Sequence, residues 1–246
     1  MTDATAPPEE DRRPIIGILG GMGPEATAAF YTRLIDLTAA HRDQDHLHVI
    51  IDADPAIPDR TAALLDGGES PVPAMRAGIA RLVAAGADLI AIPCNTAHVW
   101  IDDLRLDVEV PIVDMIRETA RAASNVLPRG AVVGLLASTG TVRSAVYDRA
   151  LEVTGLTVLH PAEAEQDEVM GAISRIKAGE RDAPRDALRT IAHHLIAEGA
   201  VGLILGCTEI PLVFPCDAVP VPVFDSLDIL TRRTVARVGV TLTETP

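Results

Sequence analysis

The chain has little of several features that mark common classes of protein. Aromatic residues make up only 2% of its 246 residues, and it has three cysteines. No apolar run approaches the roughly 18 residues of a membrane span. The first 13 residues are polar and acidic and hold no apolar segment of the kind a secretory signal needs. We therefore expect a cytoplasmic protein with an aliphatic core, reduced thiols instead of disulfides, and a disordered tail over residues 1–14.

Positive charge is also scarce. The formal net charge is −14 at pH 7, and Lys177 is the single lysine among 21 basic residues. An acidic surface argues against nucleic acid as a partner, because phosphates repel it. The seven histidines lack Cys, Asp or Glu at metal-ligand spacing, so no metal site is predicted. Because arginine is the default base here, the lone lysine is either a functional ammonium group or a solvated helix end.

The most informative feature that is present is an internal repeat. Residues 86–96 and 199–209 each read Gly-Ala, an apolar run, and a cysteine followed by polar side chains. Upstream, residues 16–23 align without a gap with residues 133–140, and this register places Phe30 opposite Tyr147. The spacing between paired positions is nearly the same for both matches. The repeat therefore predicts two similar lobes related by a pseudo-two-fold axis, with Cys94 and Cys207 at one cleft.

Short apolar runs alternate with helix-like stretches in both halves. This pattern predicts an α/β fold of two Rossmann-like lobes, each with a parallel sheet covered on both faces. The expected strands are 15–20, 47–53, 88–93, 110–113, 131–136, 156–160, 201–205 and 221–224. The expected helices are 25–40, 72–85, 97–105, 142–153, 164–178, 184–198 and 225–243. We expect the first lobe to comprise residues 15–114 and 225–246, and the second to comprise residues 115–224.

Each cysteine of the repeat falls at the carboxyl end of an expected buried strand, where open α/β sheets bind their ligands. A helix that begins there lowers the pKa of a thiol. A pair of buried core cysteines is the alternative, but polar residues follow both thiols in the sequence. The duplication indicates chemistry that needs the same group on two faces of one substrate.

The loop after the first strand allows two interpretations. Residues 21–26 satisfy the G-x-G-x-x-A pattern of a dinucleotide site, with Asp52 or Asp54 as the ribose-binding acid. That interpretation predicts an NAD-dependent dehydrogenase but explains neither the cysteines nor the repeat. Alternatively, the loop, including Met22, approaches a small ligand directly. The equivalent loop of the second half, residues 138–141, offers hydroxyl and N–H groups that suit a carboxylate.

Two further side chains are candidates by their position. Arg60 follows the second strand and is placed to bind a carboxylate with two hydrogen bonds, although most arginines are only solvated. His98 lies four residues after Cys94 and either tunes that thiol or packs against it.

Taken together, these motifs resemble the cofactor-independent aspartate/glutamate racemase superfamily, and its aspartate racemase branch most closely. The similarity runs from Ile15 to about residue 235. It rests on residues 17–24 (GILGGMGP), 57–61 (IPDRT), 93–98 (PCNTAH), 139–141 (TGT) and 206–209 (GCTE).

The resemblance implies a homodimer of two-lobed subunits with no pyridoxal phosphate and no metal. It implies that one cysteine thiolate removes the α-proton of an amino acid and that the opposite thiol protonates the other face, at Cys94 and Cys207. The implied contacts to the α-carboxylate and amino group are Asn95, Thr96, Thr141 and Thr208. Those to a side-chain carboxylate are Arg60 and Lys177, and we add Met22 as substrate-binding and His98 and Glu209 as supporting residues.

The expected reaction is interconversion of L- and D-aspartate, with glutamate as a possible substrate. Racemisation or decarboxylation of another acidic substrate is the alternative within the family. From other classes, an NAD-dependent dehydrogenase and a non-catalytic amino-acid sensor remain open.

Overall fold

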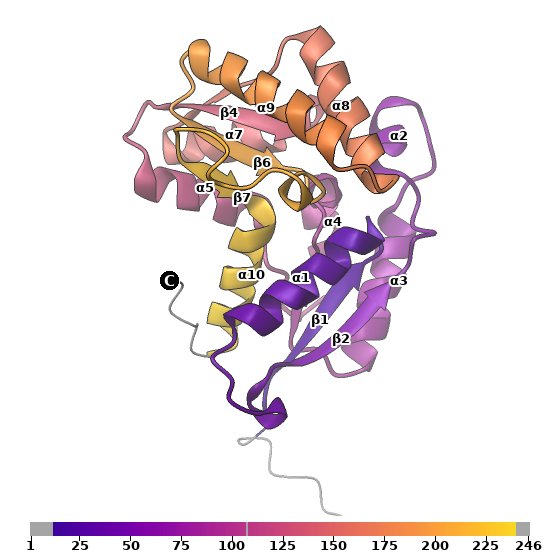
Figure 1. Ribbon diagram of the computed structural model, residues 1–246. Helices are drawn as coiled ribbons and strands as arrows, with labels where there is room; N and C mark the ends of the chain where they lie inside the picture. The colour runs from indigo at the N-terminus through magenta and orange to yellow at the C-terminus, as the bar shows by residue number, and fades with distance from the viewer. Residues whose placement is uncertain (1–11, 107, 240–246) are drawn as a thin grey trace, which may run out of the picture.

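The computed structural model describes residues 12–106 and 108–239, so most of the expected tail lies outside the described residues. Its two sheets are parallel throughout and have corresponding strand orders (Figure 1). The first runs β2-β1-β3, with β1 (Ile15–Gly20), β2 (His48–Ala53) and β3 (Leu89–Ala91). The second runs β5-β4-β6-β7, with β4 (Val132–Ala137), β5 (Thr157–Leu159), β6 (Gly202–Gly206) and β7 (Val223–Asp225). The expected two-lobed α/β fold is confirmed.

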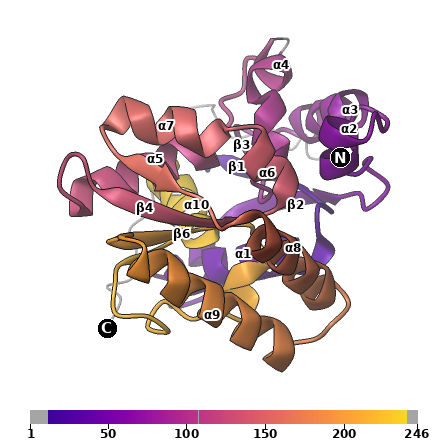
Figure 2. The same ribbon diagram turned by 90° about the horizontal axis from the view of Figure 1, so that it is seen from above.

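Helices cover both faces of each sheet, as the apolar strands require. Every residue of β1 and β6 is buried, and their sequences accordingly read as continuous small and aliphatic runs. Figure 2 shows β4 and β6 with α5 and α7 on one face and α8 and α9 on the other. The helices are α1 (Pro24–Leu37), α2 (Arg60–Leu65), α3 (Val72–Ala84), α4 (Ile101–Arg105), α5 (Met115–Val126), α6 (Thr139–Arg143), α7 (Val146–Thr154), α8 (Glu163–Lys177), α9 (Asp182–Ala197) and α10 (Ser226–Arg237).

Several expected elements differ from the observed ones. The strand expected at 110–113 is reduced to one bridge, in which the N–H of Ile90 donates to Pro111 O and that of Val113 donates to Ile90 O. The helix expected at 142–153 is two helices, α6 and α7, because Ala145 adopts a left-handed conformation with φ 54° between them. The segment expected to be helical over 97–105 begins as a 3₁₀ turn, Thr96–Trp100, before α4. Helices α2 and α5 were not expected.

Helix α10 packs against the first lobe, although it follows the last strand of the second. Its Leu227, Leu230 and Val235 share a core with Ile16 and Phe30 of the first lobe. Conversely, α5 follows the first sheet and contributes Ile116, Ala120 and Ala123 to a core around β4. Each sheet is thus covered by the helix that follows the other sheet. This exchange is consistent with our proposed division into residues 15–114 with 225–246, and 115–224.

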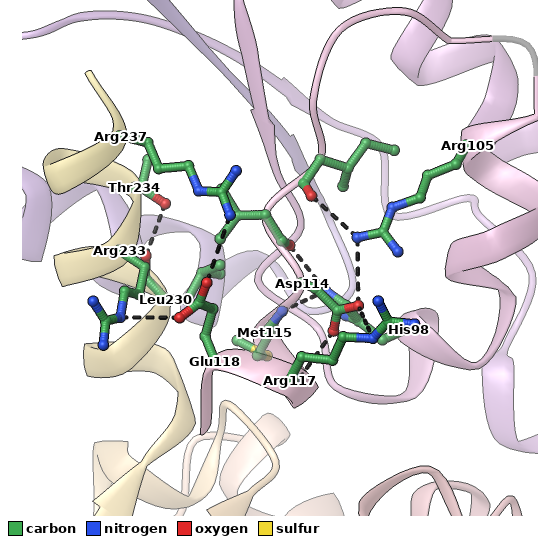
Figure 3. A network of polar contacts seen from close by, with 12 residues as sticks. His98, Arg105, Asp114, Met115, Arg117, Glu118, Leu230, Arg233, Thr234 and Arg237 are labelled. Atoms are coloured by element: carbon green, nitrogen blue, oxygen red, sulfur yellow. Dashed lines mark hydrogen bonds and ion pairs between the residues drawn. The ribbon is translucent and has the colours of Figure 1, made fainter. Parts of the chain in front are cut away.

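The two exchanged helices are joined by ion pairs. Glu118 of α5 lies 3.0 Å from Arg233 and 3.6 Å from Arg237 of α10, with only 12% of its side chain exposed (Figure 3). A carboxylate at this depth is stabilised by its two guanidinium partners.

None of the described helices has both the length and the apolar character needed to cross a bilayer.

Candidate active site

A narrow cavity lies between the lobes, where the carboxyl ends of β3 and β6 face each other. Its free volume is about 30 Å³, room for one or two water molecules. An amino acid is larger, so the lobes have to separate to admit one. The lining residues come from both lobes: Met22, Asp59, Arg60, Thr61, Cys94, Asn95, Thr96, Ser138, Met170, Ile173, Lys177, Cys207, Thr208 and Glu209.

The cavity therefore brings together most of the residues singled out by sequence. Of the expected set, Thr141 and His98 are not among its lining residues. Thr141 lies directly behind the wall, because its hydroxyl is 2.9 Å from that of Thr96 and 3.0 Å from that of Ser138.

Both repeat cysteines are free and buried, whereas the third, Cys216, is exposed. Cys207 follows β6 directly, and Cys94 follows β3 after a two-residue turn. The hydroxyl of Thr208 donates to Pro93 O at 3.3 Å, so the two strand ends contact each other across the lobes. The equivalent positions of the repeat thus line one cavity, each from its own lobe.

The surroundings of the two thiols differ. Cys207 Sγ donates to Glu209 Oε2 at 3.0 Å. Burial, and next the negative charge of Glu209, raise the pKa of Cys207 well above its ordinary value. Burial also raises the pKa of Cys94, but the positive charge of Arg60 opposes that effect. Loss of a proton is therefore more strongly opposed at Cys207.

Asn95 is fixed by two buried hydrogen bonds. Its side-chain oxygen accepts from the hydroxyl of Tyr147 at 2.6 Å, and its amide nitrogen donates to Ser226 Oγ at 3.0 Å. Ser226 in turn donates to Leu205 O at 2.7 Å. Burial raises the pKa of Tyr147, so its hydroxyl remains a donor. The amide keeps one N–H for a ligand.

Three hydroxyls form a closed triangle at the cavity wall. The hydroxyl oxygens of Thr96, Ser138 and Thr141 lie 2.9 to 3.0 Å apart, and all three residues are buried. Ser138 also caps α6 by accepting from the N–H of Thr141 at 3.3 Å. Thr96 and Ser138 line the cavity and can each turn a proton toward a carboxylate, while Thr141 behind them holds their oxygens in place before a ligand arrives.

Two cations line the cavity without a carboxylate partner among the described residues. Arg60 begins α2 and donates from Nη1 to Ile57 O at 3.0 Å and to Pro58 O at 2.9 Å. Lys177 ends α8 on the same helix face as Met170 and Ile173. Burial alone would lower the pKa of Lys177, but the negative field of Glu209 and the cysteines outweighs it and raises that pKa. Both cations are therefore available to an anionic group of a ligand.

His98 acts on the backbone and not on a thiol. Its Nε2 accepts from the N–H of Met115 at 3.2 Å, which leaves the proton on Nδ1 to donate to Cys94 O at 2.8 Å. Burial lowers the pKa of His98, so the ring stays neutral. Figure 3 shows it beside Asp114, the residue that caps α5. His98 therefore fixes the main chain at Cys94.

The glycine-rich loop offers little to a dinucleotide. Thr27 Oγ1 accepts from the N–H of Gly21 at 3.0 Å and donates to Gly23 O at 2.9 Å, which closes the loop on itself. A Cβ on Gly23 would stand 3.0 Å from Glu209 Oε1, so a carboxylate occupies the side a pyrophosphate would need. Asp52, a candidate ribose-binding acid, pairs with Arg81 at 2.8 Å.

Across the described ranges, no group of three or more His, Cys, Asp or Glu side chains is placed to hold a metal ion.

Some functional candidates were absent from the expected site set. Ser138 was noted in its loop but not selected, although its hydroxyl lines the cavity. The register of the repeat placed Tyr147 opposite Phe30, but nothing in it indicated a contact with Asn95. Ser226 carries no local signal, because its role depends on where α10 begins.

Comparison with known proteins gives consistent matches. A family model described as Asp/Glu/hydantoin racemase matches residues 19–234. The broad specificity amino-acid racemase RacX of Bacillus subtilis (strain 168) is 30% identical over 226 residues, covering 90% of this chain and 97% of that protein. Among solved structures, the aspartate racemase of Picrophilus torridus has a TM-score of 0.85 at 33% identity, with 94% and 96% of the two chains covered. An aspartate racemase homologue from Pyrococcus horikoshii OT3 has a TM-score of 0.75 at 30% identity, with 91% and 98% covered.

Proposed function

The chain belongs to the Asp/Glu/hydantoin racemase family and is a racemase, and from that premise we propose that it interconverts L- and D-aspartate by a two-base thiol mechanism without a cofactor. The observation that carries this proposal is the pair of buried thiols, which follow equivalent strands of two lobes and line one cavity. A single thiol would serve one face of a substrate, whereas racemisation requires proton transfer at both.

In the proposed reaction, one cysteine thiolate removes the α-proton, and the electron pair left on carbon takes a proton from the opposite thiol. The first sulfur ends as a thiol and the second as a thiolate, so no atoms are gained or lost. The reverse reaction exchanges the roles of Cys94 and Cys207. Because Cys207 donates a hydrogen bond to Glu209, whose negative charge opposes a thiolate there, we assign Cys207 as the first proton donor and Cys94 as the first base.

The carbanion needs stabilisation, because an α-proton is far less acidic than a thiol. We assign this task to the α-carboxylate site formed by Asn95, Thr96, Thr141 and Thr208, with Ser138 added to it. All five residues are buried and held by hydrogen bonds: the hydroxyls of Thr96, Ser138 and Thr141 to one another, Asn95 to Tyr147 and Ser226, and Thr208 to Pro93 O. Groups fixed in this way stabilise developing charge best.

The charge of the cavity supports a dicarboxylate as substrate. Arg60 and Lys177 lie at the cavity without ion-pair partners among the described residues. A guanidinium and an ammonium bind a second carboxylate more strongly than they bind an apolar side chain. Two of the matched structures are described as an aspartate racemase and a homologue of one, which supports aspartate as the substrate.

Aspartate in D₂O provides the direct test of this function. We expect the purified protein to incorporate deuterium at Cα and to produce the opposite enantiomer with no cofactor added. Absence of exchange with tight aspartate binding would favour a sensor, and dependence of turnover on added NAD would favour the dehydrogenase. Comparing aspartate, glutamate and alanine in the same assay identifies the preferred substrate.

We further propose that the protein is a homodimer, as the family resemblance implies, and that it is cytoplasmic, as expected from its composition. Sedimentation of the full chain tests the oligomeric state, and a mass of one chain would contradict it.

A further inference from the structure

One carboxylate oxygen at the cavity has no partner. Glu209 is 4% exposed, and its two oxygens have different surroundings. Oε2 accepts from Cys207 Sγ at 3.0 Å and lies 3.3 Å from Thr208 Oγ1. Oε1 is buried and forms no hydrogen bond with any described group. A buried carboxylate oxygen without a partner is unfavourable, because it has lost its hydration without gaining a hydrogen bond.

Gly23 leaves space for a ligand beside Oε1. A Cβ added to Gly23 would lie 3.0 Å from this oxygen, and beyond its chain neighbours no other described heavy atom would lie within 4 Å of it. The place that a side chain would take there is therefore open. The charge of Glu209 raises the pKa of Lys177, yet within the described part of the chain no ion pair joins the two side chains.

An amino acid carries an ammonium group as well as carboxylates. The hydroxyl, amide and cationic donors of the cavity suit the carboxylates, whereas a carboxylate is the strongest acceptor for an ammonium. Asp59 and Glu209 are the two carboxylates lining the cavity. Asp59 is exposed, and its Oδ1 caps α2 by accepting from the N–H of Ala62 at 2.8 Å. Glu209 is buried, and its Oε1 has no hydrogen-bond partner among the described residues.

We propose that Glu209 Oε1 binds the α-ammonium group of the substrate, while Oε2 holds the thiol of Cys207. This inference rests on the proposed function, because it takes an amino acid as the ligand. One carboxylate then binds the ammonium group, which distinguishes an amino acid from a simple dicarboxylic acid, and places it beside the proton donor Cys207. Glu209 is a substrate-binding residue in this arrangement.

The test compares two ligands that differ in the ammonium group. Racemic aspartate, which the enzyme leaves at equilibrium, and succinate are titrated calorimetrically into wild-type protein and Glu209→Gln. We expect the variant to lose about tenfold or more in affinity for aspartate, which corresponds to about 1.4 kcal/mol. Its affinity for succinate should stay the same or rise, because a negative charge has been removed.

Two further variants make the comparison specific. Asp59→Asn removes the other lining carboxylate and keeps an N-cap residue, so the ratio of the two affinities should stay within about twofold of wild type. Gly23→Ala keeps the charge of Glu209 and places a methyl group against Oε1. It should lower aspartate affinity selectively, and it serves as a second route if Glu209→Gln does not fold.

The outcomes separate the two proposals. Equal losses for aspartate and succinate in Glu209→Gln, or unchanged aspartate affinity, overturn the ammonium contact even when the wild type racemises aspartate. If Glu209→Gln loses affinity for aspartate but not for succinate, while the wild type shows no α-deuterium exchange, the racemase mechanism is overturned and the ammonium contact is supported. A wild type that binds neither aspartate nor glutamate overturns both.

Discussion

The hydroxyl of Tyr147, on α7, donates a 2.6 Å hydrogen bond to the side-chain oxygen of Asn95, which follows Cys94. The donor belongs to the second half of the repeat and the acceptor to the first. Because Ser226 accepts from the other end of the same amide, the orientation of Asn95 is fixed from two sides. A residue behind the cavity wall thus positions a proposed ligand of the α-carboxylate.

We predict that Tyr147→Phe lowers kcat/KM by about tenfold and stability by about 1–3 kcal/mol. The ring still fills its space, but the oxygen of Asn95 is left buried without a donor. Kinetics and urea unfolding measure the two effects. The chain's other tyrosine, Tyr31, is 39% exposed, so Tyr31→Phe is a matched control that should change neither quantity. Unchanged kinetics in Tyr147→Phe would show that Asn95 does not depend on this contact.

The two repeat cysteines provide the second prediction. Cys94→Ala and Cys207→Ala should each lower racemisation by about 10²–10⁴, the contribution of one positioned acid or base. Cys216 is the exposed third cysteine, and Cys216→Ala should retain full activity. The rate of appearance of the opposite enantiomer is the measurement. Full activity in either of the first two variants would contradict the two-base mechanism.

The pH dependence of kcat/KM should be the same in both directions, because two enantiomers have equal free energy and the ratio of the two kcat/KM values equals their equilibrium constant of one. A cysteine acts as base only as thiolate, so both values rise with pH as the cysteine pair loses its first proton. Burial raises the pKa of both thiols. The rise should therefore lie above about pH 8.5, the usual thiol pKa.

Glu209→Gln tests one cause of that shift. Besides burial, the negative charge of Glu209 raises the pKa of both cysteines. Its removal stabilises a thiolate, so the rise in kcat/KM should move to lower pH, equally in both directions. Rate profiles measured separately from L- and D-aspartate provide the comparison. An unmoved rise in Glu209→Gln would contradict the assigned influence of Glu209 on the thiols.

The sequence predicted the parts of the site that depend on local pattern. Cys94 and Cys207 each end a buried apolar run, and parallel strands bring such ends to one edge. Contacts between distant segments could not be predicted from local pattern. The hydrogen bond from Tyr147 to Asn95, for example, depends on how α7 packs against the 3₁₀ turn that follows Asn95. The left-handed Ala145 gave no sequence signal, so the break between α6 and α7 was missed. His98 was expected near a thiol, but its ring contacts depend on the main chain at Met115.

Substrate selectivity gives a fourth prediction. Lys177→Met removes the ammonium and keeps an unbranched side chain, so kcat/KM for aspartate should fall by about tenfold or more relative to that for alanine. The exposed Arg189 on α9 supplies a control, because Arg189→Met changes the net charge equally outside the cavity. Competition assays with both amino acids measure the ratio. An unchanged ratio in Lys177→Met would show that Lys177 does not bind the side-chain carboxylate.

Closure of the lobes provides the last prediction. Gly140 of α6 faces α2, and a Cβ there would stand 2.8 Å from Thr61 Oγ1 and 3.1 Å from Thr61 Cα. Overpacking of this kind costs about 1–3 kcal/mol. Because α2 and α6 belong to different lobes, the clash is relieved by holding the lobes apart, which opposes closure around the substrate. Gly140→Ala should therefore raise the KM for aspartate about tenfold, with a smaller effect on Tm.

Gly171 is the matched control, since it also lies in a helix. A Cβ there would have Arg175 Nη1 as its nearest neighbour, at an ordinary 3.8 Å. Alanine is favoured over glycine within a helix by about 1 kcal/mol, so Gly171→Ala should raise Tm and leave KM unchanged. If Gly140→Ala lowers Tm strongly without changing KM, the α2–α6 contact stabilises the fold and does not govern closure.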